Sequence, residues 1–420
     1  MNKLIFKKHR QEFADQMKEY SFALFYSGEA PHKTADQFYQ YVPNRNFYYL
    51  TGLKNANNIL LLLKTESSFL EFMFIEEASD FATKWLGRRL TKDEVSTICD
   101  VEVKNIHFLN EFTNFVSQQI LSNSRKALTV FPKKVYLDLY RSKPNSRPIS
   151  LDQSDFFLKN YPEIRIQNAN EILDIKRMYK SQEEVALISQ AIEYAKKGIE
   201  AIFRFTKPKY NEHQLEALFE YTIKSEGSEG LSFNSIIASG KNATILHYED
   251  NFCEIKDGDL VLLDLGALSD TYASDISRTF PANGTFTSRQ AKIYEIVLSV
   301  NKKTIEYVKP GIFVADLNRY AKDLLTQGLK AIGLIKEDSE IDRYYYHSVS
   351  HYLGLDVHDV GTYQEPLKPG IVLTVEPGLY IEEEGLGIRI EDNVLVTEEG
   401  HINLSESIIK EMKDIEAFMK

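Results

Sequence analysis

The chain has little cysteine, no long apolar run and no surplus of positive charge, and each deficiency excludes a class of protein. Its two cysteines, Cys99 and Cys253, lie far apart in 420 residues, so we expect neither a disulfide framework nor a thiolate metal site. No run approaches the roughly 18 apolar residues that span a bilayer. The N-terminal residues are charged and lack an apolar segment, which argues against a secretory signal. We therefore expect a cytoplasmic protein with no membrane partner.

Charge and composition narrow the class further. The net charge is −11 and no dense basic patch is present, so nucleic acid is not an expected partner. The chain is 43% hydrophobic and 26% charged, which is typical of a globular protein. Its length predicts two or three domains.

The first part of the chain alternates helical and extended patterns. Phe13, Met17 and Tyr20 form a helical stripe, and residues 58–64 and 69–75 are apolar runs typical of buried strands. Residues 141–148 are rich in turn formers. We interpret residues 1–172 as an α/β domain.

The second domain, residues 173–420, is predicted to be α+β. Capping boxes mark three helix starts, at Ser181 with Glu184, Asn211 with Gln214, and Thr287 with Gln290. A fourth helix is predicted over residues 314–332. Strands are predicted at 260–265, 271–280, 371–375 and 387–396. Runs of strands and runs of helices, rather than strict alternation, indicate α+β.

Five residues suited to binding metal interrupt segments that otherwise look buried. They are Asp264, Asp275, His351, Glu376 and Glu391. An ionised carboxylate is costly to remove from water, so buried acids are usually paired or bound to metal. Four such carboxylates with a histidine in one half of the chain suggest a single site.

Strand geometry supports a common location for part of this set. A hairpin between Asp264 and Asp275 would place both carboxylates on neighbouring strands of one sheet. Because side chains alternate along a strand, Arg389 and Glu391 should face one side while Ile388 and Ile390 face the other.

Charge balance predicts what fills the site. At an effective dielectric of about 20, two like charges 4 Å apart repel by roughly 4 kcal/mol. Two divalent cations would balance four carboxylates, with neutral His351 completing the ligands. Oxygen-rich ligation with one imidazole suits Mn²⁺, with Co²⁺, Fe²⁺ or Zn²⁺ as alternatives. Two such ions generate hydroxide near neutral pH and polarise a carbonyl, which indicates metal-assisted hydrolysis.

Each residue also has a structural interpretation. Asp275 could cap a turn, Glu376 before Pro377 could close a strand, and His347 with His351 could be a helix-face pair in a core. That pair is not the zinc-protease H-E-x-x-H motif, because Ser348 stands where the glutamate is needed. Only the joint occurrence of all five residues favours the metal site.

Motifs along the second half resemble the pita-bread metallopeptidases, and among them most closely the aminopeptidase P family. The similar stretches are residues 245–248, 260–266, 275–281, 351–361, 373–381 and 387–393. Residues 47–52 and 84–90 are more weakly similar to that family's creatinase-like N-terminal domain. The resemblance implies hydrolysis of the bond between an N-terminal residue and a following proline, by a metal-bridging hydroxide. It also implies a homodimer or homotetramer.

The resemblance assigns roles residue by residue. It implies that Asp264 chelates one metal, that Asp275 and Glu391 bridge, and that His351 with Glu376 holds the other. Glu376 is then also the general base. His247, His347 and His358 match substrate-side histidines, Arg389 and Tyr380 match residues that support the ligands and move protons, and Trp85 matches a tryptophan near the site mouth.

The sequence departs from the family's motifs at two positions, and several alternative functions are considered. Ser348 and Tyr352 replace the family's usual glycine and frequent tryptophan, which makes the preference for proline less secure. Prolidase, which cleaves only dipeptides, shares all five ligands, although Ser350 and the segment around Trp85 favour the aminopeptidase. Methionine aminopeptidase usually lacks a large N-terminal domain. A metal-free binding module or a creatinase would have lost ligands that this chain retains.

Overall fold

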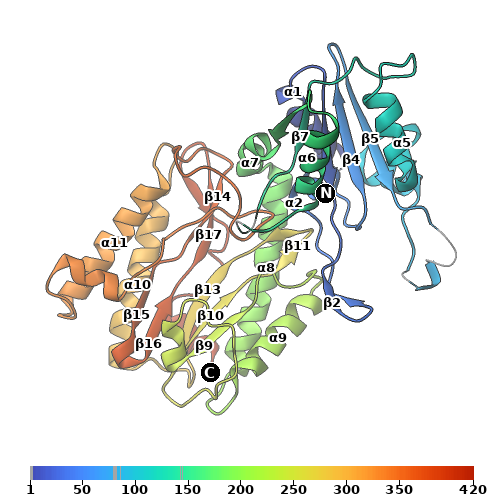
Figure 1. Cartoon of the computed structure of the whole chain (residues 1–420). Helices are drawn as coiled ribbons and strands as arrows, with labels where there is room; N and C mark the ends of the chain where they lie inside the picture. Colours follow the sequence, from blue (N-terminus) through green and yellow to red (C-terminus); the bar gives the residue numbers. More distant parts are fainter. Residues whose placement is uncertain (1–2, 79–82, 86, 142, 144) are drawn as a thin grey trace. The chain divides into compact units, whose positions relative to one another are not determined.

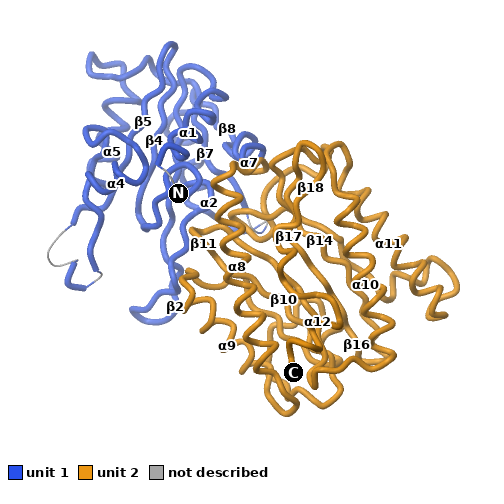
Figure 2. Tube along the Cα trace, turned by 180° about the vertical axis from the view of Figure 1, so that it is seen from behind, with its two compact units in different colours: residues 1–176 blue, residues 177–420 orange. Residues whose placement is uncertain are grey.

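The computed structural model describes residues 3–78, 83–85, 87–141, 143 and 145–420. The chain divides into two compact units, residues 1–176 and 177–420 (Figures 1 and 2). The division predicted from sequence, after residue 172, lies four residues earlier. No helix among the described residues is both long and apolar enough to cross a membrane.

Unit 1 is built on a six-stranded sheet in the order β6-β5-β4-β1-β7-β8. Its strands are β1 (Ser21–Tyr26), β4 (Ile59–Lys64), β5 (Phe69–Ile75), β6 (Ile106–Phe108), β7 (Lys134–Leu137) and β8 (Arg165–Asn168). β4 is antiparallel to both of its neighbours, and β1 is parallel to β7. β1 is buried along its whole length. The two apolar runs at 58–64 and 69–75 are therefore strands, as predicted.

Helices and a small hairpin complete unit 1. They are α1 (Lys3–Gln16), α2 (Arg45–Thr51), α4 (Lys92–Cys99), α5 (Phe112–Phe115), α6 (Ile149–Asn160), α7 (Asn170–Met178) and the hairpin β2 (His32–Thr34) with β3 (Gln37–Phe38). α7 crosses the boundary between the units. The helical stripe predicted at Phe13, Met17 and Tyr20 is wrong at its end. The helix α1 stops at Gln16, and Tyr20 has a positive φ of +54°. In the predicted loop 141–148, residues 142 and 144 lie outside the described residues, and 141, 143 and 145–148 are not helix or strand.

Unit 2 carries its strands between two pairs of helices. α8 (Gln182–Phe205) and α9 (Glu212–Ser225) lie on one side of the strands, and α10 (Ser288–Tyr307) and α11 (Val314–Ala331) lie on the other (Figures 1 and 2). All four helices were predicted from sequence. The capping boxes that start α8, α9 and α10 are formed as expected. A short helix, α12 (Met412–Phe418), follows the last strand.

The strands of unit 2 form several small antiparallel sheets. One has the order β13-β10-β9, with β9 (Ile236–Ser239), β10 (Leu260–Leu265) and β13 (Ile276–Pro281). Another has the order β14-β17-β18, with β14 (Val372–Val375), β17 (Asp392–Val396) and β18 (His401–Asn403). Two hairpins join β11 (Leu268–Ser269) to β12 (Tyr272–Ala273) and β15 (Gly378–Ile381) to β16 (Leu386–Arg389).

Two predicted strands are each interrupted once. The predicted strand 271–280 breaks between β12 and β13, at Asp275, and the predicted strand 387–396 breaks between β16 and β17, at Glu391. The two breaks bond to each other. The backbone N–H of Glu391 donates to the Ser277 carbonyl at 3.0 Å, and the Asn393 amide donates to the Asp275 carbonyl at 2.6 Å. At each break the chain therefore leaves its own ladder and bonds across to the other sheet.

Candidate active site

The five predicted metal ligands come from separate segments of unit 2. Asp264 lies on β10, next to its end, and pairs in register with Ser277 of β13. Asp275 and Glu391 lie at the two strand breaks, and Glu376 directly follows β14. His351 lies in an irregular segment before β14. β10 and β13 are antiparallel neighbours, as the predicted hairpin requires, but Asp275 lies directly before β13 rather than on it. In the sequence, β11 and β12 come between the two strands.

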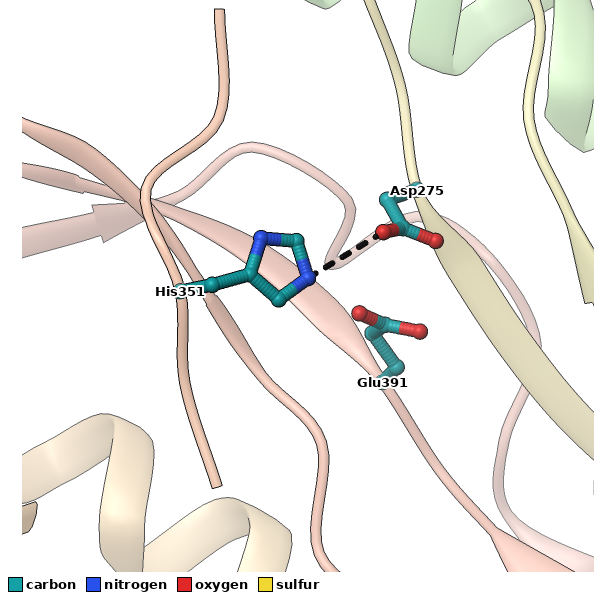
Figure 3. A group of neighbouring side chains, drawn as sticks. All are labelled: Asp275, His351 and Glu391. Atoms are coloured by element: carbon teal, nitrogen blue, oxygen red, sulfur yellow. Dashed lines mark ion pairs between the residues drawn. The ribbon is translucent and has the colours of Figure 1, made fainter. Parts of the chain in front are cut away.

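The fold brings these side chains together. Asp275, His351 and Glu391 each offer one ligand atom, and these atoms all lie within 4.8 Å of one another (Figure 3). The Nε2 atom of His351 lies 3.3 Å from Asp275 Oδ2 and 3.5 Å from Glu376 Oε1. Such a set of oxygens around one imidazole can hold a divalent cation.

Backbone contacts orient the His351 ring. Its Nδ1 atom lies 3.0 Å from the Tyr352 carbonyl, so Nδ1 carries the proton that this carbonyl accepts. Nε2 is thereby turned toward the carboxylates. A ring nitrogen fixed in this way by its partner is the usual arrangement for a metal-binding histidine.

Burial, and after it the nearby like charges, raises the pKa values of the carboxyl groups. Burial raises the pKa of Asp275 to about 6 and that of Glu376 to about 7, although His351 opposes both shifts. Burial, together with the charges of Asp275 and Glu376, raises the pKa of Glu391 well above its usual range. Burial alone would lower the pKa of His351, but its bond to Asp275 and the charge of Glu376 raise it to about 9. Protons thus offset part of the negative charge, and a cation would replace them.

Unpaired oxygens test whether these residues suit a metal. Asp264 Oδ2 accepts from Arg389 at 2.6 Å and Glu391 Oε2 accepts from Ser277 at 2.8 Å. Within the described residues, the other oxygen of each, Asp264 Oδ1 and Glu391 Oε1, is buried and has no hydrogen-bond partner. Buried polar atoms are almost always satisfied. One free oxygen on each carboxylate, in a cluster of acids around His351, fits the donor set of a hard cation.

Ser277 and Thr374 support the ligands and were not singled out from sequence. Ser277 Oγ donates to Glu391 and accepts from Arg389 Nε at 2.8 Å. Thr374 Oγ1 lies 3.3 Å from Glu376 Oε1 and accepts from the His351 backbone N–H at 3.1 Å. Each lies two residues from a ligand, Ser277 after Asp275 and Thr374 before Glu376. In the sequence both look like ordinary strand residues, so no local pattern marks this role.

Arg389, Tyr380 and His347 form a chain of hydrogen bonds. Arg389 donates to the Tyr380 hydroxyl at 3.0 Å, and that hydroxyl lies 2.8 Å from His347 Nε2. His347 Nδ1 lies 2.8 Å from the Ser348 carbonyl, which makes Nδ1 the protonated nitrogen and leaves Nε2 to accept from Tyr380. Burial and the charge of Arg389 lower the pKa of His347 to about 4. The ring is thus neutral, and it is held 3.7 Å from Glu376.

His247 and His358 lie at the same site, and both side chains are exposed. The His358 ring lies 4.2 Å from the His351 ring, centroid to centroid. Burial, followed by the charges of His351 and His247, lowers the pKa of His358 to about 4. The charge of His247 also acts on His347. The structure therefore brings together all three predicted substrate-side histidines.

A buried ion cluster lies behind Glu391. Arg278 and Asp392 are fully buried, and their side chains bond at 2.9 Å. Arg278 also donates to the carbonyls of Glu391, Ile408 and Ile409, at 2.6, 3.1 and 3.1 Å. Lys410 donates to Asp392 at 2.6 Å. Residues 408–410 are thus bonded to Arg278 and Asp392, and Asp392 directly follows Glu391.

The remaining predicted residues make local contacts. Trp85 is 75% exposed in unit 1, and its role stays a prediction. Ser348 Oγ lies 3.0 Å from Asn318 Oδ1. The Tyr352 ring stacks on Tyr363 with centroids 4.6 Å apart.

Comparison with known proteins gives matches over both units. The model of metallopeptidase family M24 matches residues 186–398, and that of the aminopeptidase P N-terminal domain matches residues 6–130. The Xaa-Pro aminopeptidase of Escherichia coli is 33% identical, over 99% of this chain and 97% of the relative. The structure of a protein assigned as an aminopeptidase P from Bacillus anthracis superposes with a TM-score of 0.95 at 45% identity, covering 100% of this chain and 98% of that one. Zinc-substituted E. coli aminopeptidase P in complex with product gives 0.91 at 31% identity, with the same coverage.

Proposed function

The chain belongs to metallopeptidase family M24 and is a metalloaminopeptidase, and we propose that it removes the N-terminal residue from peptides whose second residue is proline. The observation that carries this proposal is the cluster of Asp275, His351 and Glu391, with ligand atoms within 4.8 Å. Similarity to Xaa-Pro aminopeptidases over nearly the whole chain supports the substrate class. Proline's tertiary amide lacks an N–H and fixes φ, so general peptidase clefts accommodate it badly.

Two divalent ions, most simply Mn²⁺, would be held by Asp264, Asp275, His351, Glu376 and Glu391. When bound, such ions supply a water of lowered pKa and polarise the carbonyl under attack. The free oxygens of Asp264 and Glu391 support this donor set. Co²⁺, Fe²⁺ and Zn²⁺ are the alternatives to test, and zinc-substituted E. coli aminopeptidase P shows that a relative accepts one of them.

The protein's own groups would move the proton. Glu376 takes a proton from the attacking water as the water oxygen bonds to the scissile carbonyl carbon. The carbon–nitrogen bond then breaks, and the proton passes from Glu376 to the proline nitrogen, which leaves as a secondary amine. The Glu376 carboxyl lies 3.7 Å from His347 and 3.5 Å from His351, beside the groups proposed to bind the peptide and the metal.

The histidines would position the peptide. His358, whose ring lies beside that of His351, and His247, whose charge acts on His358, are exposed and could donate to the peptide carbonyls. Neutral His347 is held in one orientation by Tyr380 and the Ser348 carbonyl. Arg389 bonds both Asp264 and Tyr380, so it couples the orientation of a proposed ligand to that of His347.

The deciding experiment compares X-Pro dipeptides with X-Pro-Y tripeptides. We expect cleavage of the tripeptides, with loss of activity after chelation and its return with Mn²⁺. An X-Ala-Y peptide is the matched control and should be cleaved poorly. Cleavage of dipeptides alone would assign the chain to prolidase, and activity indifferent to chelation would refute the metal site.

Assembly and location complete the proposal. We propose a homodimer or homotetramer, which light scattering behind a sizing column would measure directly. A cytoplasmic location stays a prediction that cell fractionation would test.

A further inference from the structure

One carboxylate far from the proposed metal ligands in sequence holds both ends of the segment that carries His247. We propose that Glu212 is a positioning residue for His247, and that it sets the geometry of the peptide-binding side of the site. This inference rests on the proposed function for its kinetic consequence, but not for its structural content. We call residues 240–253 the His247 segment.

Glu212 is the first residue of α9 and is completely buried. In the part of the chain that the structure describes, no cation pairs with it. Five donors satisfy it instead. Its Oε1 accepts from Ser239 N at 2.8 Å, Ser239 Oγ at 2.7 Å and Asn242 Nδ2 at 3.0 Å, and its Oε2 accepts from Tyr248 Oη at 2.8 Å and Cys253 N at 2.9 Å.

These donors divide between the two ends of the His247 segment. Oε1 holds Ser239 and Asn242, where the chain leaves β9 and the segment begins. Oε2 holds Tyr248 and Cys253, on the far side of His247. The two oxygens of one carboxylate, about 2 Å apart by covalent geometry, thus fix the separation of the ends between which His247 lies.

Other contacts also hold the His247 segment. Asn251 anchors the end of the segment to β9, through Ile237 N at 2.9 Å and the Ser235 carbonyl at 2.8 Å. Tyr346 donates to the Thr244 carbonyl at 2.7 Å. Tyr248, the residue after His247, is buried and donates to Glu212. The residues on both sides of His247 are thus held, Leu246 by packing against the cluster that contains Tyr248 and Tyr380, and Tyr248 by its bond to Glu212.

Burial of a carboxylate without a cation is costly unless its oxygens are hydrogen-bonded. A carboxylate whose two oxygens each accept from a backbone N–H is also difficult to replace. The new group must accept a hydrogen bond at both positions. In Glu212→Gln the amide NH₂ would face Ser239 N–H in one orientation and Cys253 N–H in the other. Neither backbone donor can turn away, so this nearly isosteric change must displace one end of the His247 segment.

The experiment measures kinetics and the His247 imidazole together. An X-Pro-Y tripeptide is the substrate, and Glu212→Gln, His247→Ala and the double variant are compared in the full-length, metal-loaded protein. We expect Glu212→Gln to lower kcat/KM about 10-fold to 100-fold, the scale of a small misplacement of a reacting group. The loss should be shared between kcat and KM in the same proportion as in His247→Ala. In the His247→Ala background, Glu212→Gln should have little further effect on kcat/KM. Glu220→Gln, the same change on the solvent-facing side of α9, is the matched control.

The His247 signal is read by NMR of ¹³C-labelled histidines in the Zn²⁺-loaded protein, with His247→Ala assigning it. Glu212→Gln should shift that signal and leave the His351 signal and the metal content unchanged. Tyr248→Phe removes only the hydrogen bond from Tyr248 to Glu212 and should give a smaller shift of the His247 signal. This variant replaces Glu212→Gln in the test if Glu212→Gln does not fold.

Two results would overturn the proposal. One is an unmoved His247 signal in Glu212→Gln or, where that variant does not fold, in Tyr248→Phe. The other is an equal loss of kcat/KM with and without His247. If the wild-type protein cleaves no X-Pro-Y peptide, the proposed function fails, and the NMR measurement alone decides the role of Glu212.

Discussion

Replacing Glu391 with glutamine should stabilise the metal-free protein and weaken its response to metal. Glu391 is buried beside Asp275, and their ligand atoms lie within 4.8 Å of each other. Two unit charges at that distance repel by about 3 kcal/mol at an effective dielectric of about 20. Glu391→Gln removes this repulsion and keeps the shape of the side chain.

The sign of the pH dependence follows from the raised pKa of Glu391. A carboxyl whose pKa is higher in the folded than in the unfolded state holds its proton more tightly when folded. Ionisation therefore costs nothing below the unfolded pKa of about 4.3 and costs progressively more as pH rises toward the folded pKa. The stabilisation by Glu391→Gln should be small at pH 5 and larger at pH 8 to 9.

Thermal unfolding after chelator treatment measures the effect. For a unit of this size each kcal/mol corresponds to roughly 2–4 °C in Tm, so a rise of several degrees at pH 8 is expected. Added Mn²⁺ should raise the Tm of the wild type well above that of Glu391→Gln. Glu399→Gln, at an exposed turn, is the control and should match the wild type. A metal-free Glu391→Gln protein no more stable than the wild type at pH 8, or one equally stabilised by metal, would refute the charge-crowding argument.

Three further predictions test other parts of unit 2. Asp264→Ala should lower tripeptide cleavage by orders of magnitude and reduce bound metal, measured by elemental analysis, while circular dichroism stays unchanged. Asp359→Asn removes the buried carboxylate shared by Lys180 and Arg177 and should cost about 3 kcal/mol at pH 7 in urea unfolding. Burial would raise the pKa of Asp359, but the two cations lower it, so its contribution is complete above about pH 4 and lost as pH falls through the folded pKa; the variant should approach the wild type there. Gly387→Ala places a Cβ 2.0 Å from the Ala243 carbonyl oxygen and should lower both Tm and kcat/KM, whereas Gly400→Ala, with open space around it, should not.

Periodicity and capping predicted much of the fold. Capping boxes gave the starts of α8, α9 and α10, and apolar runs gave β4, β5 and β10. These features depend on neighbours a few residues apart, so the sequence contains them directly. The strand breaks at Asp275 and Glu391 were missed because the bonds that form them come from the other sheet, more than a hundred residues away.

The site could be predicted in composition but not in detail. The four acids and the histidine stood out because each interrupts a buried pattern. The contacts that orient them did not, because Ser277 and Thr374 look like ordinary strand residues until their partners are known. The hydrogen bonds by which Glu212 holds the His247 segment were missed for a related reason. Glu212 follows the Asn211 cap and looks like a routine first-turn acid, and only its complete burial distinguishes it.

The ion cluster of Arg278, Asp392 and Lys410 sets a limit on how the chain can be engineered. Residues 408–410 contribute no atom to chemistry, yet they supply two carbonyls and an ammonium to the pair that anchors the backbone at Glu391. An insertion or fusion junction in that stretch would leave every proposed ligand in the sequence and still yield an inert enzyme. The exposed turn at residues 398–399 offers a safer position for a graft.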